Sequence, residues 1–212
     1  MQINEIITES LSRTAFHYTN VLSALKILTS GKFELSSVLG SIEQQYAPKG
    51  YPYFLSTTRT RHGGYHDYIG SHAAMFVLDG NWFNNNYKAG PVDYWQNRNP
   101  SQISHRGHEA EDRVFSKEPT IPIGGVTAVH IYISPEADPE VKAWGRKALI
   151  AAKRQGITTH FYTDPKAWKN FDTRKPGDVS ILAGQEQTGG YTSMRPRSEE
   201  RRVGKECLRL CR

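Results

Sequence analysis

Glu109 and Glu111 lie one residue apart within residues 106–116, where the chain enters an apolar, strand-like stretch. In an extended strand, alternate side chains point to the same face, so both carboxylates are expected on one side. Two carboxylates held together can stabilise positive charge that develops on a bound substrate, and one of them can steer a nucleophile. A solvated strand face is the common alternative for such a pair.

Two earlier strand-like segments end in imidazole and hydroxyl side chains. Residues 16–19 read Phe-His-Tyr-Thr, and residues 53–58 read Tyr-Phe-Leu-Ser-Thr-Thr, followed closely by Arg59 and Arg61. Imidazole and hydroxyl groups can hydrogen-bond a sugar, and a guanidinium can bind phosphate through its fork of donors. A structural histidine and an ordinary strand end would give the same pattern. Arg113, just after the glutamates, is expected to be a surface charge.

The hydrophobic pattern and the turn residues predict an α+β fold that positions these segments. Strands are expected at residues 14–19, 33–35, 51–58, 73–78, 110–115, 126–133 and 157–162. Helices are expected at residues 21–28, 138–155 and 165–171. Asn20 is a candidate N-cap for the first helix, and Gly31 is its stop signal.

Residues 79–108 are rich in Asn, Gly and Pro and have no clear periodicity, so a loop-like region is expected there. Exposing all of its aromatic side chains would be costly, so they are expected either to cover a cleft or to pack a local mini-core. These aromatic residues are Trp82, Phe83, Tyr87, Tyr94 and Trp95.

The composition is that of a folded domain, with 37% hydrophobic and 23% charged residues among 212. A single domain is expected at residues 1–171, followed by a loose segment at 172–196. Residues 197–212 resemble a translated sequencing adapter and are expected to be an artefact. They contain half of the formal net charge of +6 and both cysteines, so no disulfide or thiolate site is expected elsewhere. With no export signal and no apolar run of about 20 residues, a cytoplasmic location is expected.

The order of the three segments resembles the ADP-ribosyltransferase superfamily over about residues 14–133. Residues 16–19 and the helix ending at Ser30-Gly31 are similar to its H-x-T-like strand and following helix. Residues 53–58 are similar to its aromatic and Ser-Thr strand, and Glu109-Ala110-Glu111 to its E-x-E strand. The resemblance implies a single α+β domain whose mixed or antiparallel sheets, with flanking helices, form a cleft for NAD.

The resemblance also implies transfer of ADP-ribose from NAD to a macromolecular acceptor, protein or nucleic acid, with release of nicotinamide. Glu111 would stabilise the charge developing on the ribose, and Glu109 would steer or deprotonate the acceptor. His17, where E-x-E families usually carry arginine, would donate a hydrogen bond to the ribose or the nicotinamide amide. The other NAD-binding residues implied are Tyr18, Thr19, Ser56, Thr57, Arg59 and Tyr65, with Tyr68 as the alternative to Tyr65.

Two other functions remain open on the sequence. The histidines near the glutamates are a possible donor set for a metal-dependent hydrolase or nuclease, namely His62, His66, His72, His105 and His108. No H-E-x-x-H string supports this, and no metal ligand is assigned. Tyr94 and Trp95, followed by polar residues 96–99, are typical of a non-catalytic module that stacks on nucleic acid or binds protein. No P-loop or G-x-G-x-x-G motif occurs.

Overall fold

A computed structural model describes residues 11, 13–41, 44, 47–58, 72–91 and 111–170 of the chain. Its strands are β1 Thr14–Asn20, β2 Lys32–Glu34, β3 Ser36–Ser37, β4 Tyr53–Thr58, β5 His72–Asp79, β6 Lys88–Pro91, β7 Glu111–Ser116, β8 Thr120–Pro122, β9 Val126–Ile133 and β10 Thr158–Tyr162. Its helices are α1 Val21–Ser30, α3 Gly80–Asn86, α4 Pro139–Arg154 and α5 Pro165–Asn170. The predicted α+β class is therefore confirmed.

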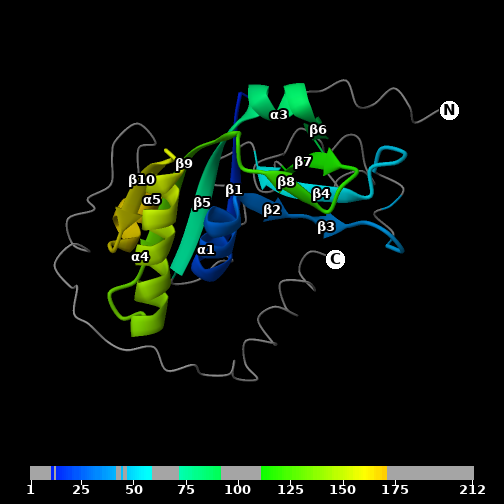
Figure 1. Cartoon of the computed structure of the whole chain (residues 1–212). Coiled ribbons are helices and arrows are strands. Elements are labelled where there is room, and N and C mark those ends of the chain that lie inside the picture. Colours follow the sequence, from blue (N-terminus) through cyan, green and yellow to red (C-terminus); the bar gives the residue numbers. More distant parts are fainter. Residues whose placement is uncertain are drawn as a thin grey trace, which may run out of the picture.

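One sheet organises the described residues, in the order β10-β9-β5-β1-β4-β7-β6, with β3 beside β4 (Figure 1). Only β9 and β10 pair in parallel, joined through α4, and the other neighbours in this sheet are antiparallel. Strands β2 and β8 form a separate pair in front of β4 and β7. The sheet is thus mostly antiparallel, as mixed α+β folds commonly are.

The sheet divides between β1 and β4. Strand β1 pairs with β5 along its whole length, from Thr14 to Asn20, but its register with β4 contains the single pair Phe16 and Thr58. On the other side, β4 pairs with β7 over all six of its residues. Two well-paired halves therefore meet at one point, beyond which main-chain groups need other partners.

Helix α1 begins and ends where the local sequence dictates. The Asn20 side chain accepts a hydrogen bond from the Ser23 amide, and Gly31 closes the helix with a left-handed φ of 70°. Val21, Ala24 and Leu28 form its buried side. The helix boundaries predicted from the cap residues are confirmed.

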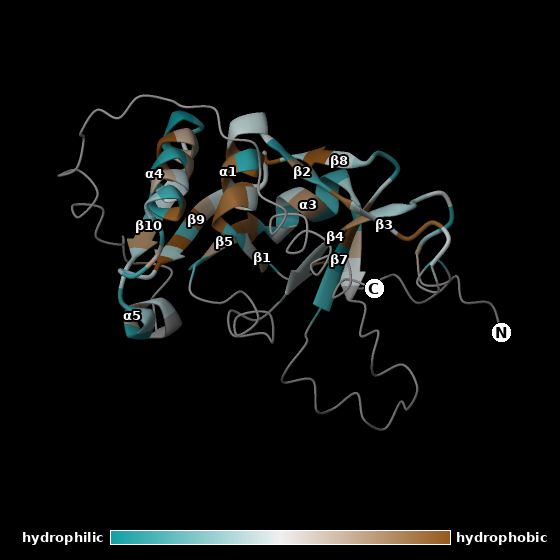
Figure 2. Ribbon diagram, turned by 90° about the horizontal axis from the view of Figure 1, so that it is seen from below, coloured by the Kyte–Doolittle hydropathy of each residue, from teal (hydrophilic) through white to brown (hydrophobic). Residues whose placement is uncertain are grey.

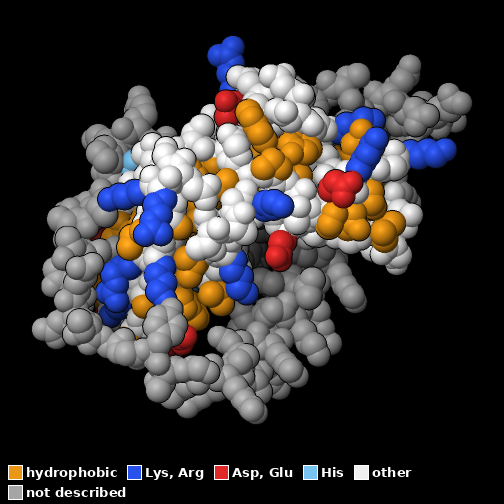
Figure 3. All heavy atoms as spheres, in the orientation of Figure 1, with side chains coloured by type: hydrophobic (Ala, Val, Ile, Leu, Met, Phe, Trp, Pro, Cys, Tyr) orange, Lys and Arg blue, Asp and Glu red, His pale blue; other side chains and the backbone are white. Residues whose placement is uncertain are grey.

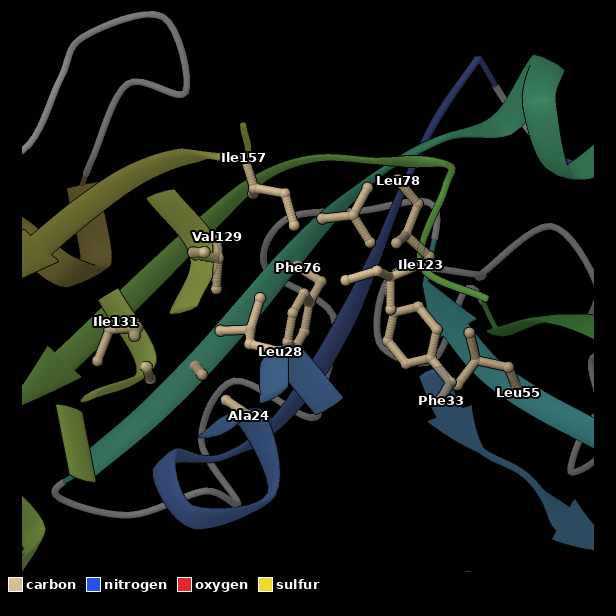
Figure 4. Packing of buried hydrophobic residues seen from close by; sticks show 14 of the residues in the cluster. Ala24, Leu28, Phe33, Leu55, Phe76, Leu78, Ile123, Val129, Ile131 and Ile157 are labelled. Atoms are coloured by element: carbon tan, nitrogen blue, oxygen red, sulfur yellow. The ribbon is translucent and has the colours of Figure 1, made fainter. Parts of the chain in front are cut away.

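Helices α1 and α4 cover one face of the sheet, and the short α5 lies on the other (Figure 2). The main core lies under α1 and α4, where Leu28 of the helix meets Phe76 and Val129 of the strands (Figure 4). Phe33 of β2 and Leu55 of β4 extend this core beneath the second half of the sheet. The apolar core thus ties the two halves together from the helical side.

The prediction of a loop at residues 79–108 is wrong for its first part. Residues 80–86 form α3, and residues 88–91 form β6 at the sheet edge. The Asp79 side chain caps α3 by accepting from the amides of Asn81 and Trp82. Phe83 is fully buried and contacts the rings of Trp82 and Tyr87, as the mini-core alternative predicted. Tyr94 and Trp95 lie outside the described residues.

No helix among the described residues is long and apolar enough to cross a membrane. The segments predicted at residues 172–196 and 197–212 lie outside the described residues, so the structure says nothing about them.

Candidate functional site

Strands β1, β4 and β7 bring three of the predicted site residues together. Thr58 on β4 pairs with Phe16 on one side and with Glu111 on the other, so the first residue of β7 lies beside the division of the sheet. On β1, His17 is the residue after Phe16. On β4, Ser56 lies two residues before Thr58. The candidate site therefore lies where the two halves of the sheet meet.

A chain of hydrogen bonds crosses the three strands through Ser56. His17 Nδ1 lies 2.8 Å from the main-chain oxygen of Ser56. The Ser56 hydroxyl donates to Glu111 Oε1 over 2.9 Å. Because the strand ladder stops after Phe16 and Thr58, the imidazole provides the partner that the Ser56 carbonyl would otherwise find in a neighbouring strand.

Arg113 also holds Glu111, from the same strand. Its Nε donates to Glu111 Oε1 over 2.9 Å, and its guanidinium carbon lies 4.0 Å from the centre of the Phe54 ring. Arg113 is only 4% exposed and Glu111 6%. The expectation that Arg113 is a surface charge is wrong, because cross-strand pairing places it over Phe54 and beside Ser56 rather than in solvent.

The side chains divide between the two faces of the sheet. Alternation from the pair Phe16 and Thr58 puts Tyr18, Ser56 and Glu111 on one face. His17 leaves β1 on the opposite face, where its ring makes an edge contact with Phe33 at 5.5 Å and lies 6.2 Å from Phe76. His17 and Glu111 are thus linked through Ser56 and do not face each other across a groove.

The hydrogen bond fixes the tautomer of His17. A carbonyl oxygen only accepts, so Nδ1 carries the proton and Nε2 of the neutral ring is an acceptor. Burial lowers the pKa of His17 below its usual value, and the bond to the Ser56 carbonyl offsets this only in part. The described structure uses the Nδ1 donor of His17 within the fold, and the expected role of His17 as a donor to a ligand stays a prediction.

This pKa shift predicts a pH-dependent stability. The unfolded chain takes up a proton at His17 near pH 6.5, whereas the folded chain does so only at lower pH. The contribution of His17 to the free energy of unfolding should therefore be constant above pH 6.5 and fall as the pH drops towards the folded pKa. One group contributes at most about 1.4 kcal/mol per pH unit. Urea unfolding of the wild type and of His17→Gln at pH 7.5 and 5.5 measures this change in the free energy of unfolding. If both proteins lose the same free energy between the two pH values, the prediction is wrong.

The other predicted residues are placed differently. The Thr57 hydroxyl donates to the main-chain oxygen of Asp112 in a buried position, which gives it a structural partner. Thr19 lies half-buried at the end of β1, opposite Ala74 of β5. Tyr18 packs against a second cluster of buried side chains, which includes Phe16, Met75 and Trp168. Glu109, Arg59, Arg61, Tyr65 and Tyr68 lie outside the described residues.

Metal ligands are not assembled in the part of the chain that the structure describes, where no group of three His, Cys, Asp or Glu side chains is placed to hold an ion. His72 begins β5, and the other histidines of the predicted metal set lie outside the described residues. The described residues form surface grooves of about 460 Å³ beside Tyr51 and Lys88 and of about 390 Å³ beside Tyr132 and Asp164. Neither groove is lined by His17, Ser56 or Glu111.

Comparison with known proteins finds similarity only at the level of structure. No protein-family model matches the chain, and no curated protein matches its sequence. The structure is similar to that of Thermus sp. 2.9 DarT in complex with NAD+, with 10% sequence identity, a TM-score of 0.43, and coverage of 76% of this chain and 99% of that chain. The complex of the same protein with carba-NAD+ gives 10% identity and a TM-score of 0.43, over 74% and 97%. With these values, the function has to be inferred from the chain's own residues and contacts.

Proposed function

We propose that this chain transfers ADP-ribose from NAD to a macromolecular acceptor, with Glu111 as the catalytic residue. The observation that carries the proposal is the fixed carboxylate of Glu111. It receives the Ser56 hydroxyl and the Arg113 Nε, each at 2.9 Å, and it lies at the division of the sheet. Any buried carboxylate needs hydrogen-bond and charge partners, and here these partners also hold Glu111 in one orientation, as a catalytic carboxylate requires.

The reaction would break the bond between the ribose and nicotinamide. Nicotinamide leaves with the bonding electron pair, so positive charge develops on the ribose ring. A carboxylate that is 6% exposed stabilises this charge more strongly than one in water, because the surroundings screen it less. An oxygen or nitrogen nucleophile of the acceptor then bonds to the ribose carbon and gives up its proton to a base, a role we assign to Glu109.

The geometry divides the remaining residues into two groups. Tyr18 and Ser56 share the face of Glu111, so they are the described side chains best placed to contact the ribose or nicotinamide. His17 would act indirectly, by holding the Ser56 main chain through its Nδ1. The proposal retains Thr19, Arg59 and Tyr65 as NAD-binding residues and gives Thr57 a structural role.

The function is tested with NAD labelled in two places. The full chain is incubated with cell extract and with NAD labelled either on the adenylate phosphate or on nicotinamide. We expect label in acid-insoluble material from the first substrate and free nicotinamide from the second. Treatment of the product with protease or nuclease then shows which polymer is the acceptor. The protein, DNA and RNA fractions of the extract are each offered as acceptor. If both labels stay in intact NAD with every fraction, the proposal is wrong.

A further inference from the structure

Helix α4 has one face that packs against the rest of the fold and an opposite face that is half-buried or exposed. Its buried side consists of small and apolar residues that pack towards α1, β9 and β10, namely Val141, Gly145, Ala148, Leu149 and Ala152. Close packing is tightest at Gly145, where an added Cβ would lie 2.2 Å from the Ile133 side chain. The orientation of α4 on the sheet is therefore fixed, and so is the direction of its outer face.

The outer face of α4 is basic. At 3.6 residues per turn, five cationic side chains fall on one side of the helix around Ile150, which is 50% exposed. They are Lys142, Arg146, Lys147, Lys153 and Arg154, and we call them the α4 cation face. Figure 3 shows Lys and Arg side chains gathered over this helix. The one acidic residue of the helix is Glu140, in its first turn.

This charge pattern is unfavourable for an isolated surface helix. Solvated helices usually gain stability from opposite charges four residues apart, whereas Lys142 and Arg146 have this spacing and the same sign. Lys142 is partly neutralised, since its ammonium donates to the Pro135 oxygen and lies near Glu136. Lys153 and Arg154 lie in the last turn, where a positive charge interacts favourably with the negative end of the helix dipole. Arg146 is too far from that end to be stabilised by the dipole. A polyanion bound along the face would relieve the repulsion.

Three kinds of polyanion differ in what they require of the helix. A membrane surface attracts a basic face by charge, but a stably bound interfacial helix also inserts an apolar face, and that of α4 is already buried in the core. A protein partner usually contacts aromatic anchors, with lysine depleted, whereas Ile150 is the single large apolar side chain exposed on this face. A polynucleotide needs regularly placed cations and no apolar anchor.

We propose that the α4 cation face docks a polynucleotide by contacting its phosphates without reading its bases. From Lys142 to Arg154 the helix rises about 18 Å, over which one strand of a duplex carries about five phosphates. Arg146 and Arg154 can each contact a phosphate through two N–H groups. The face lies on the β9–β10 side of the sheet, with β5, β1 and β4 between it and Glu111 on β7. The proposal therefore stands independently of the proposed transferase activity.

The test compares two variants of the full chain that lose the same amount of charge. The first carries Arg146→Gln, Lys153→Gln and Arg154→Gln on α4. The second carries Lys49→Gln, Lys88→Gln and Lys117→Gln, three exposed cations on the β4–β7 side of the molecule. Binding of a fluorescent 20-nucleotide strand and of its duplex is followed by anisotropy over a series of salt concentrations, after circular dichroism has shown that both variants fold.

We expect the α4 variant to bind about 100-fold more weakly at about 0.1 M salt, because each of the three lost phosphate contacts accounts for roughly fivefold there. The slope of log K against log salt should become shallower by about 2, since each contact contributes about 0.7 to 0.9. The second variant should stay within about threefold of the wild type. Equal losses in both variants, or no binding by the wild type, would overturn the proposal. Binding of vesicles with phosphatidylserine but not of either oligonucleotide would overturn it in favour of a membrane.

Discussion

Glu111→Gln is expected to lower the rate of ADP-ribosyl transfer by at least a factor of about 100, because removing one electrostatic group that acts only in the transition state typically costs 10²–10³. The substitution keeps an oxygen that can accept from Ser56 and Arg113, but it removes the charge that pairs with the buried Arg113, so folding of the variant is checked by circular dichroism. The loss should appear in kcat, while the KM for NAD changes by no more than a few fold. Release of nicotinamide, measured at several NAD concentrations, separates the two effects.

Two further variants make this result specific. Glu118→Gln removes an exposed carboxylate just beyond β7, so it should leave the rate within about twofold of the wild type. Glu111→Asp keeps the charge but draws it back by one methylene, and an intermediate rate is expected. If Glu111→Gln transfers as fast as the wild type, Glu111 is not catalytic, and the proposed mechanism fails.

Arg113→Met is expected to reduce the free energy of unfolding by about 3–5 kcal/mol, because it removes one partner of a buried ion pair. The methionine fills most of the space over the Phe54 ring, so loss of packing contributes less. Urea unfolding at pH 7 measures the change. This is a larger effect than the 0–1 kcal/mol of an exposed ion pair.

The double variant Glu111→Gln with Arg113→Met provides the control. With both charges removed, no uncompensated ion remains, so the double variant should be more stable than Arg113→Met alone. A double variant that loses the sum of the two single changes would show that the residues are not coupled. Arg113→Met should also slow transfer, since Glu111 then keeps only Ser56 of its two described anchors.

Local signals in the sequence were sufficient for most of the fold. Strand β9 matches its predicted residues 126–133, and α4 lies within one residue of its predicted bounds at each end. Helix α3 was missed because its seven residues are too few to show a periodicity, and because Asn and Gly dominate the segment. Its capping residue Asp79 was the available signal, followed by the apolar pair Trp82 and Phe83.

The candidate site was only partly predictable for a different reason. The sequence singled out Ser56 and Glu111, and cross-strand pairing places them in hydrogen-bond contact. Nothing local indicated that Arg113 would be buried, because its burial depends on Phe54 and Ser56, which lie more than fifty residues earlier. The face on which His17 lies depends on the register between β1 and β4, and that register consists of one pair.

The amino-acid sequence by itself therefore determined the class of fold, the bounds of the capped or strongly periodic elements, and the residue types that can perform the chemistry. These properties depend on interactions between residues close in the chain, such as Asn20 with Ser23. The tertiary structure alone decided that Ser56 joins His17 to Glu111, that Arg113 pairs with a buried carboxylate, and that the His17 ring lies on the opposite face of the sheet. These contacts join strands far apart in the sequence, so strand order and register decide them, and local propensity does not.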